Sequence, residues 1–403
     1  DPIVQDFFRS NPLWTYHSPV DHLLPNVTRT VDPDAVFYEN LMRHMQANGK
    51  SVCEYASGMA CQLEFARVAL EAKGIGPDND EFIGQVLKEV VSHEVGHCLG
   101  LRHNFKGSTW LPMSEIAEHD IAGDPNVGSV MDYNPPIVAP PGQKQGSYTT
   151  RSIGPYDHWA IEYGYRPAGK PYKDEAEMLK KIGSRAAEAG LDYATDEDTM
   201  PPLSPDPLTN RFDMGRDVMD YATRQIELAD GLLKDIKEWS VKDGQSYDRL
   251  RRAFTTVLGQ RTAACAYVAQ FPGGQIINRD HKGDPNGRTP ITPVNAKEQR
   301  RAVQYISKKV FAEDAFQINP ELLAYLGPGR WSHWDSDNFE MLTDFKIHEF
   351  VARAQYQCLM MSLNPFTIRR IHDNQVKFAE NEDAYSLAEH LNFLAQRLDK
   401  LIP

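Results

Sequence analysis

Hydrophobic residues recur three or four positions apart in the first half of the chain, which is the spacing of one face of a helix. This spacing predicts a helix over about 58–72, ended by two nearby glycines, and a second helix that starts after the turn at 77–80 and ends at Gly100. A third predicted helix covers 155–163, with proline in its first turn. The second helix is expected to carry its apolar face on Ile83, Val86, Leu87, Val90 and Val91.

The pattern beyond residue 166 is also mainly helical. Two prolines mark a boundary there, and one short run, 275–279, has strand character after a pair of glycines. The amphipathic segments predicted to be helices lie near 174–189, 214–238, 246–270, 296–312, 340–362 and 383–400. We therefore expect an N-terminal domain over 1–166 and a mainly helical C-terminal domain over 167–403.

The composition is that of an ordinary soluble protein. The 403 residues are 41 % hydrophobic and 25 % charged, and the formal net charge is −13. No basic tract is present to neutralise phosphates, which argues against a nucleic-acid partner. No apolar run approaches the ~18 residues of a membrane-spanning helix. The five cysteines are too few for a disulfide framework, and both a Cys53–Cys61 bond and two reduced thiols stay open.

One stretch of the second helix has the residues of a metal site. His93 and His97 lie four residues apart, so on a helix both imidazoles point to the same side and can reach one tetrahedral ion. Glu94 projects beside them, about 100° round the helix axis from His93. A carboxylate there can accept a proton from a water molecule that the metal activates. We therefore expect Glu94 to act as the general base.

Gly100 and His103 extend this stretch to the pattern HExxHxxGxxH. Glycine at the end of a helix accepts left-handed backbone angles at little cost, so the chain can turn back. His103, three residues on, can then add a third nitrogen from outside the helix. Three protein ligands and one open position are typical of catalytic zinc sites, whereas structural sites are closed by four ligands. The sequence thus predicts one catalytic Zn²⁺, although these residue types do not prove zinc over another divalent ion.

A loop with a methionine follows the histidines, because Met131 stands in Ser-Val-Met-Asp-Tyr, 28 residues after His103. The histidine pattern and this loop together resemble the metzincin clan, in which a tight turn carries a methionine beneath the three histidines. Tyr133 resembles the tyrosine of astacins and serralysins. That resemblance implies a place beside the zinc, where it stabilises the oxyanion; a packed tyrosine is the alternative. Asp157 resembles the aspartate that braces the methionine turn in serralysins and matrixins, which implies a structural role.

A closer resemblance covers residues about 53–400 and is to large zinc-dependent metalloproteases of bacterial cell envelopes. It rests on the stretches LRHNFKGS, SVMDYNPP, IGPYDHWAIEYGY and FPGGQIINRD. It implies a location outside the cell, in the periplasm or in the envelope, and a zincin-like α+β fold that is predominantly α. Such a domain normally has a twisted sheet before the active-site helix. Residues 1–92 show no clear alternating strands, so we expect the chain to begin within the catalytic domain and to lack part of that sheet.

These features predict a zinc-dependent endopeptidase, a hydrolase that acts on protein or peptide substrates. The alternative is an envelope scaffold or binding protein that keeps the metal but has lost turnover, with the helical C-terminal half as its interaction surface. The presence of Glu94 favours the enzyme, because a purely structural metal site needs no base there. The sequence indicates neither the peptide preference nor the oligomeric state.

Overall fold

The computed structural model describes residues 53–75, 80–116, 123–139, 144–168, 173–201, 203–329, 344–379 and 382–401. Contacts between residues divide the chain into a unit over 1–56 and a compact unit over 57–403. Only residues 53–56 of the first unit are described. The spacing of Phe37, Leu41 and Met45 also predicts a helix that begins near Val36, and this prediction lies outside the described residues. The fold and the site below are those of the second unit.

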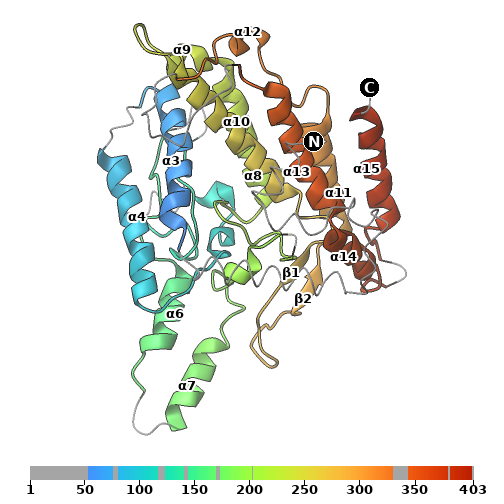
Figure 1. Cartoon of the computed structure of the whole chain (residues 1–403). Coiled ribbons are helices and arrows are strands. Elements are labelled where there is room, and N and C mark those ends of the chain that lie inside the picture. The colour runs from blue at the N-terminus through green and yellow to red at the C-terminus, as the bar shows by residue number, and fades with distance from the viewer. Residues whose placement is uncertain are drawn as a thin grey trace, which may run out of the picture. The chain divides into compact units, whose positions relative to one another are not determined.

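Two helices, α3 (Tyr55–Ala72) and α4 (Asp80–Cys98), run side by side along one side of the structure (Figure 1). Their ends agree with the predicted ones. Gly74 follows α3 with a φ of +72°, and Gly100 follows α4 with a φ of +84°, both in the left-handed region that glycine adopts at little cost. Two acidic residues in the first turn of α4 suit the positive end of its dipole. Local sequence signals therefore set the limits of the helix that carries the histidines.

The apolar face predicted for α4 is only partly buried. Val86 lies in the interior, but Ile83, Leu87 and Val91 are 44 %, 59 % and 58 % exposed, so the prediction was wrong for these three. The exposed apolar residues follow one another every four positions: Ile83, Leu87, Val91, Val95 and Leu99. The buried face is instead made of Phe82, Val86, Glu89, His93 and Gly96. Spacing gives the faces of a helix but not which of two apolar faces meets the core.

The main core lies between α3 and two long helices of the second half, α8 (Val218–Lys234) and α10 (Asp248–Val268). α8 and α10 pack along each other, with the short helix α9 (Ile236–Ser240) between them in the chain. Phe65 and Val68 of α3 belong to the same apolar cluster as Leu228 and Phe254. These contacts cross the boundary expected near residue 166, and the division into two domains stays a prediction.

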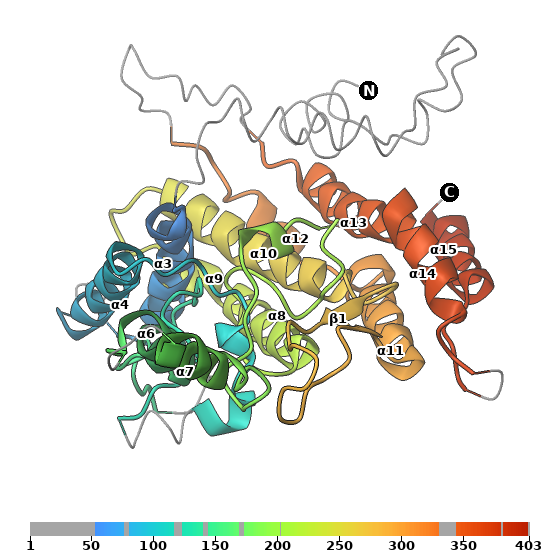
Figure 2. The same cartoon turned by 90° about the horizontal axis from the view of Figure 1, so that it is seen from below.

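The remaining elements surround this core (Figure 2). A hairpin of β1 (Gln275–Ile277) and β2 (Ile291–Pro293), paired with Ile276 opposite Thr292, is the whole sheet of the described residues. The other helical elements are η2 (Gly107–Thr109), α6 (Pro155–Tyr165), α7 (Lys173–Gly183), η3 (Asp196–Asp198), α11 (Ala296–Ile306), the π-helix η4 (Ser307–Phe311), α12 (Pro320–Leu323), α13 (Ile347–Leu363), α14 (Pro365–Gln375) and α15 (Leu387–Leu401). The described chain is thus mostly helical with one small sheet, as an α+β fold that is predominantly α requires. None of its helices combines the length and apolar character needed to cross a bilayer.

Candidate metal centre

Three histidines converge at the C-terminal end of α4. His93 and His97 lie on successive turns, with ring centroids 4.8 Å apart, and the ring of His103 lies 5.2 Å from His93 and 4.7 Å from His97. One ring nitrogen from each lies within 4.8 Å of those of the other two. His93 and His103 are buried and His97 is half-buried. The structure therefore brings together the three histidines that the sequence marked as candidate ligands.

Gly100 returns the chain toward the helix so that His103 can reach the other two. The amide of Leu101 donates to the carbonyl of Gly96 at 3.0 Å, and the amide of Gly100 donates to the carbonyl of His97 at 2.9 Å. These two bonds, with a left-handed residue between them, form a Schellman motif. A residue with a side chain at position 100 would be strained in that conformation. The glycine thus acts on the site through the backbone alone.

The two histidines of α4 are oriented by backbone carbonyls. The Nδ1 atom of His93 lies 2.7 Å from the carbonyl oxygen of Val130, and that of His97 lies 2.9 Å from the carbonyl oxygen of Leu101. A carbonyl can only accept a hydrogen bond, so each Nδ1 must carry the hydrogen. A neutral ring in that tautomer has its free lone pair on Nε2, the atom available to a metal ion.

The third histidine is oriented by a side chain. Nδ1 of His103 lies 2.8 Å from Oδ1 of Asp196, again leaving Nε2 as the free nitrogen. The Nε2 atoms of His97 and His103 lie 3.2 Å apart. Two lone pairs facing each other at that distance repel unless a proton or a cation lies between them. Burial, with a smaller effect of the other two histidines, also lowers the pKa of His93 to about 3, which keeps it neutral as a metal ligand must be. The donor set fits a zinc ion.

The two residues expected to act in catalysis, Glu94 and Tyr133, differ in burial. Glu94 is exposed, beside the buried His93 on the same helix. Tyr133 is only 2 % exposed, with its ring centroid 4.9 Å from that of His103. Phe105 and Phe212 pack on Tyr133 at centroid distances of 5.1 and 5.4 Å. Tyr133 is thus both close to the histidines and firmly packed, so its position agrees with either of the two roles considered for it.

Met131 is completely buried and lies against Gly96 of α4. A Cβ atom on Gly96 would lie 2.1 Å from its sulfur atom, closer than any two such atoms can approach. The methionine therefore packs directly on α4 between the turns that carry His93 and His97. Gly96 permits this contact, and a glycine within the histidine motif is the signal in the sequence from which this contact could have been predicted.

Comparison with protein-family models gives a match to the family described as Met-zincin over residues 76–400. The chain belongs to the Met-zincin family. Comparisons with curated proteins and with solved structures gave no match. The family agrees with the expectation of a metzincin-type zinc metalloprotease.

In this Met-zincin the loop that carries Met131 is held by Asp157 of α6. One carboxylate oxygen accepts from the Ser129 hydroxyl at 2.6 Å, and the other accepts from the amides of Val130 and Gly154 at 2.9 and 2.8 Å. Burial raises the pKa of Asp157, although these hydrogen bonds oppose the rise. Asp157 therefore acts on the metal centre through Val130, whose amide donates to Asp157 and whose carbonyl is the partner of His93.

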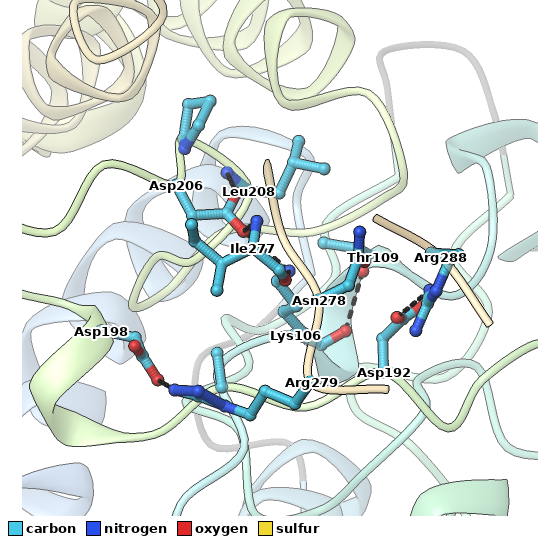
Figure 3. Close-up of polar contacts among 12 residues, drawn as sticks. Lys106, Thr109, Asp192, Asp198, Asp206, Leu208, Ile277, Asn278, Arg279 and Arg288 are labelled. Carbon is cyan, nitrogen blue, oxygen red and sulfur yellow. Dashed lines mark hydrogen bonds and ion pairs between the residues drawn. The ribbon is translucent and has the colours of Figure 1, made fainter. Parts of the chain in front are cut away.

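A second group of supports comes from residues far along the chain. Lys106 forms a buried ion pair with Asp206 at 2.7 Å, and its ammonium also donates to the carbonyl of Ile277 in β1 at 2.7 Å (Figure 3). On the other side of the same loop, the Ser108 amide donates to Asp132 at 2.8 Å and its hydroxyl donates to Asp213 at 2.9 Å. The segment after His103 is therefore fixed between the methionine loop and the second half of the chain.

The sequence did not indicate Asp196, Asp206 or Asp213 as parts of this region. Each lies in a loop or a single helical turn, without a spacing that would mark it. The acidic run at 196–198 is the one local hint, and such runs are common on solvated surfaces. Burial opposes the ionisation of Asp196, but its hydrogen bond with His103 and the charges of Arg211 and Arg102 outweigh this and lower its pKa. Asp196 is thus a carboxylate anion next to an imidazole.

Proposed function

We propose that this Met-zincin is a zinc-dependent endopeptidase, in which His93, His97 and His103 hold one catalytic zinc ion and Glu94 is the general base. The observation that carries the proposal is the arrangement of the three rings. Each engages Nδ1 with an acceptor, and two of the free Nε2 atoms approach to 3.2 Å. Such an arrangement is costly unless an ion occupies the space between the rings.

The chemistry of peptide hydrolysis would divide between the ion and the protein. Bound zinc supplies Lewis acidity, which brings the pKa of an attacking water to ~7 and polarises the scissile carbonyl. Glu94 accepts the proton from that water and passes it to the leaving amine. Tyr133 donates a hydrogen bond to the carbonyl oxygen as negative charge develops on it. The buried Met131 and Asp157 keep the floor of the site rigid.

The exposure of Glu94 supports its role as the base. A structural metal site gains nothing from a carboxylate beside the ligands, whereas a base must reach both water and substrate. The substrate would be a protein or peptide, because the proposed chemistry is that of an amide bond. We further propose a location outside the cell or in its envelope, which rests on the resemblance to exported metalloproteases alone.

The test uses the full chain, an unstructured protein substrate and matched variants. Wild-type protein loaded with zinc is expected to cleave the substrate, to lose activity with a chelator and to regain it when zinc is added back. Glu94→Gln should lower kcat by roughly 10²–10⁴-fold, because a general base contributes about that much, while the zinc content stays at one ion. Glu81→Gln, in the first turn of the same helix, is the control and should keep full activity.

Two results would contradict the proposal. Cleavage that is insensitive to both the chelator and Glu94→Gln would place the activity elsewhere. Zinc binding at one ion per chain without any cleavage would instead support a scaffold or binding protein that retains the metal.

A further inference from the structure

Asp196 differs from the partners of the other two candidate ligands. His93 and His97 are each oriented by a neutral carbonyl, whereas His103 faces a carboxylate at 2.8 Å. Asp196 lies 93 residues after His103 in the chain, in the single turn η3 (Asp196–Asp198). The orientation of the third candidate ligand, His103, therefore depends on a segment that is distant in sequence.

Backbone next to Asp196 forms hydrogen bonds with the segment that follows His103. The amide of Phe105 donates to the carbonyl of Ala194 at 2.8 Å, and the amide of Ala194 donates to the Asn104 side chain at 3.2 Å. These contacts lie directly before η3 and directly after the third ligand. They bring the carboxylate and the imidazole to the same place independently of the hydrogen bond between them.

Three arginine side chains contact the carboxylates of η3. Arg102 approaches Asp196 at 3.7 Å and Arg211 approaches it at 3.8 Å, while Arg279, just after β1, pairs with Asp198 (Figure 3). The two arginines at Asp196 are too distant to compete for hydrogen bonds with His103, but they favour the ionised carboxylate. The partner of His103 is thus a fixed anion rather than a mobile surface side chain, since Asp196 is only 25 % exposed.

We infer that Asp196 is a positioning residue for His103: its carboxylate fixes the hydrogen of His103 on Nδ1, sets the angle of the ring and makes Nε2 a stronger donor to the metal ion. This inference rests on the proposed zinc site and adds a residue to it. A carboxylate partner strengthens a histidine ligand more than a carbonyl does, because the imidazole–metal bond draws charge from the ring and the anion compensates for it. His103 would therefore be a strong ligand only while the segment 194–198 is in place.

A purely structural role is the competing explanation. Asp196 would then only neutralise Arg102 and Arg211, and its loss would loosen the loop without changing the donor strength of His103. Zinc affinity separates the two roles when it is measured beside the stability of the metal-free protein. Loss of a positioning residue lowers the zinc affinity more than it lowers the stability of the metal-free protein.

The experiment measures zinc affinity by competition with a chromophoric chelator for the wild type, Asp196→Ala, Asp196→Asn and Glu197→Ala. Loss of an outer partner of a metal ligand costs about 10–100-fold in affinity, which we expect for Asp196→Ala. Asp196→Asn keeps the shape and one acceptor oxygen without the charge, so the loss of zinc affinity should be smaller in this variant. Glu197→Ala is the matched control, since Glu197 is 56 % exposed and pairs with Arg102 at 2.8 Å but not with His103. It should bind zinc as the wild type does.

A spectroscopic readout and a folding readout complete the test. Cobalt substituted for zinc should give visible bands that differ between Asp196→Asn and the wild type but not between Glu197→Ala and the wild type. The metal-free forms of Asp196→Asn and Glu197→Ala should unfold at similar temperatures. Unchanged affinity and unchanged cobalt bands in Asp196→Asn and Asp196→Ala would overturn the inference while leaving the zinc site intact. If Asp196→Ala does not fold, Asp196→Asn decides alone. A wild type that binds no zinc would overturn the site and the inference together.

Discussion

The two ends of the candidate metal centre are built in different ways. His93 and His97 stand on one helix and are oriented by carbonyls, one of them only four residues away. His103 leaves the helix after Gly100 and depends on Asp196 and on contacts with residues beyond 190. The comparison teaches that a compact motif can specify which residues converge while the strength of one ligand is set elsewhere. The histidine motif thus contains all three candidate ligands, but the partner that orients His103 lies outside it.

The largest effect on stability that would test this difference is expected at Lys106, three residues after His103. Lys106→Met leaves Asp206 as a buried, unpaired charge, which typically costs about 3–5 kcal/mol of the free energy of unfolding. It also removes the hydrogen bond to the carbonyl of Ile277. Urea unfolding of the metal-free protein measures the loss.

The double variant Lys106→Met/Asp206→Leu is the matched control for this prediction. It removes both charges, so part of the lost stability should return. The return is incomplete because the amides of Leu208 and Ile277, which each donate to Asp206 at 3.0 Å, lose their acceptor. A single variant as stable as the wild type would show that the second half of the chain does not hold the segment after His103, and the two ends of the centre would then be equally local.

The limits of α4 and the place of β1 could be predicted because their signals are local. Glycines that take positive φ values end the helices, and a pair of glycines precedes the run that forms β1. The convergence of the three histidines also follows from spacing plus one turn at Gly100. Helices α12 and α14 were missed, although each opens with an asparagine cap and a proline, which are local signals for the start of a helix. With only four residues, α12 is too short to show a period, and it depends on packing.

The supports of the site could not be predicted for a different reason. Asp196, Asp206 and Asp213 reach the segment of the site through partners about 100 residues away, and an aspartate in a loop has the same local pattern whether it is solvated or buried. Periodicity failed on α4 in a related way. Both of its faces are apolar, and only tertiary contacts determine that Val86 faces inward and Leu87 outward.

A smaller effect is expected from the buried carboxylates behind the methionine loop. Burial raises the pKa of Asp213 to about 6, although hydrogen bonds from Ser108 and Asn210 oppose the rise, and burial together with the charge of Asp213 raises that of Asp132. The folded state therefore binds a proton that the unfolded state has already lost at the same pH. The free energy of unfolding should fall as the pH rises through 6, which is the sign for an acid whose folded pKa is raised.

Asp213→Asn removes this titration and isolates its contribution. The stability of the wild type relative to Asp213→Asn should fall by about 1 kcal/mol between pH 5 and pH 7.5, as expected for a folded pKa near 6 and an unfolded one near 4. Denaturant unfolding at several pH values measures the difference. A difference that stays constant over this range, or one that grows with pH, would show that Asp213 is ionised in the folded state.

The smallest effect concerns the face of α4 that points away from the histidines. Leu87 is 59 % exposed, so Leu87→Gln should change the free energy of unfolding by no more than about 0.5 kcal/mol. Val86→Gln is the matched change one position earlier, on the buried face, and should cost more than about 2 kcal/mol because it places an amide among apolar side chains. Thermal and urea unfolding of both variants measure the contrast. If Leu87→Gln proved as damaging as Val86→Gln, the outer face of α4 would be covered in solution, and the helix that carries His93 and His97 would depend on distant contacts as much as His103 does.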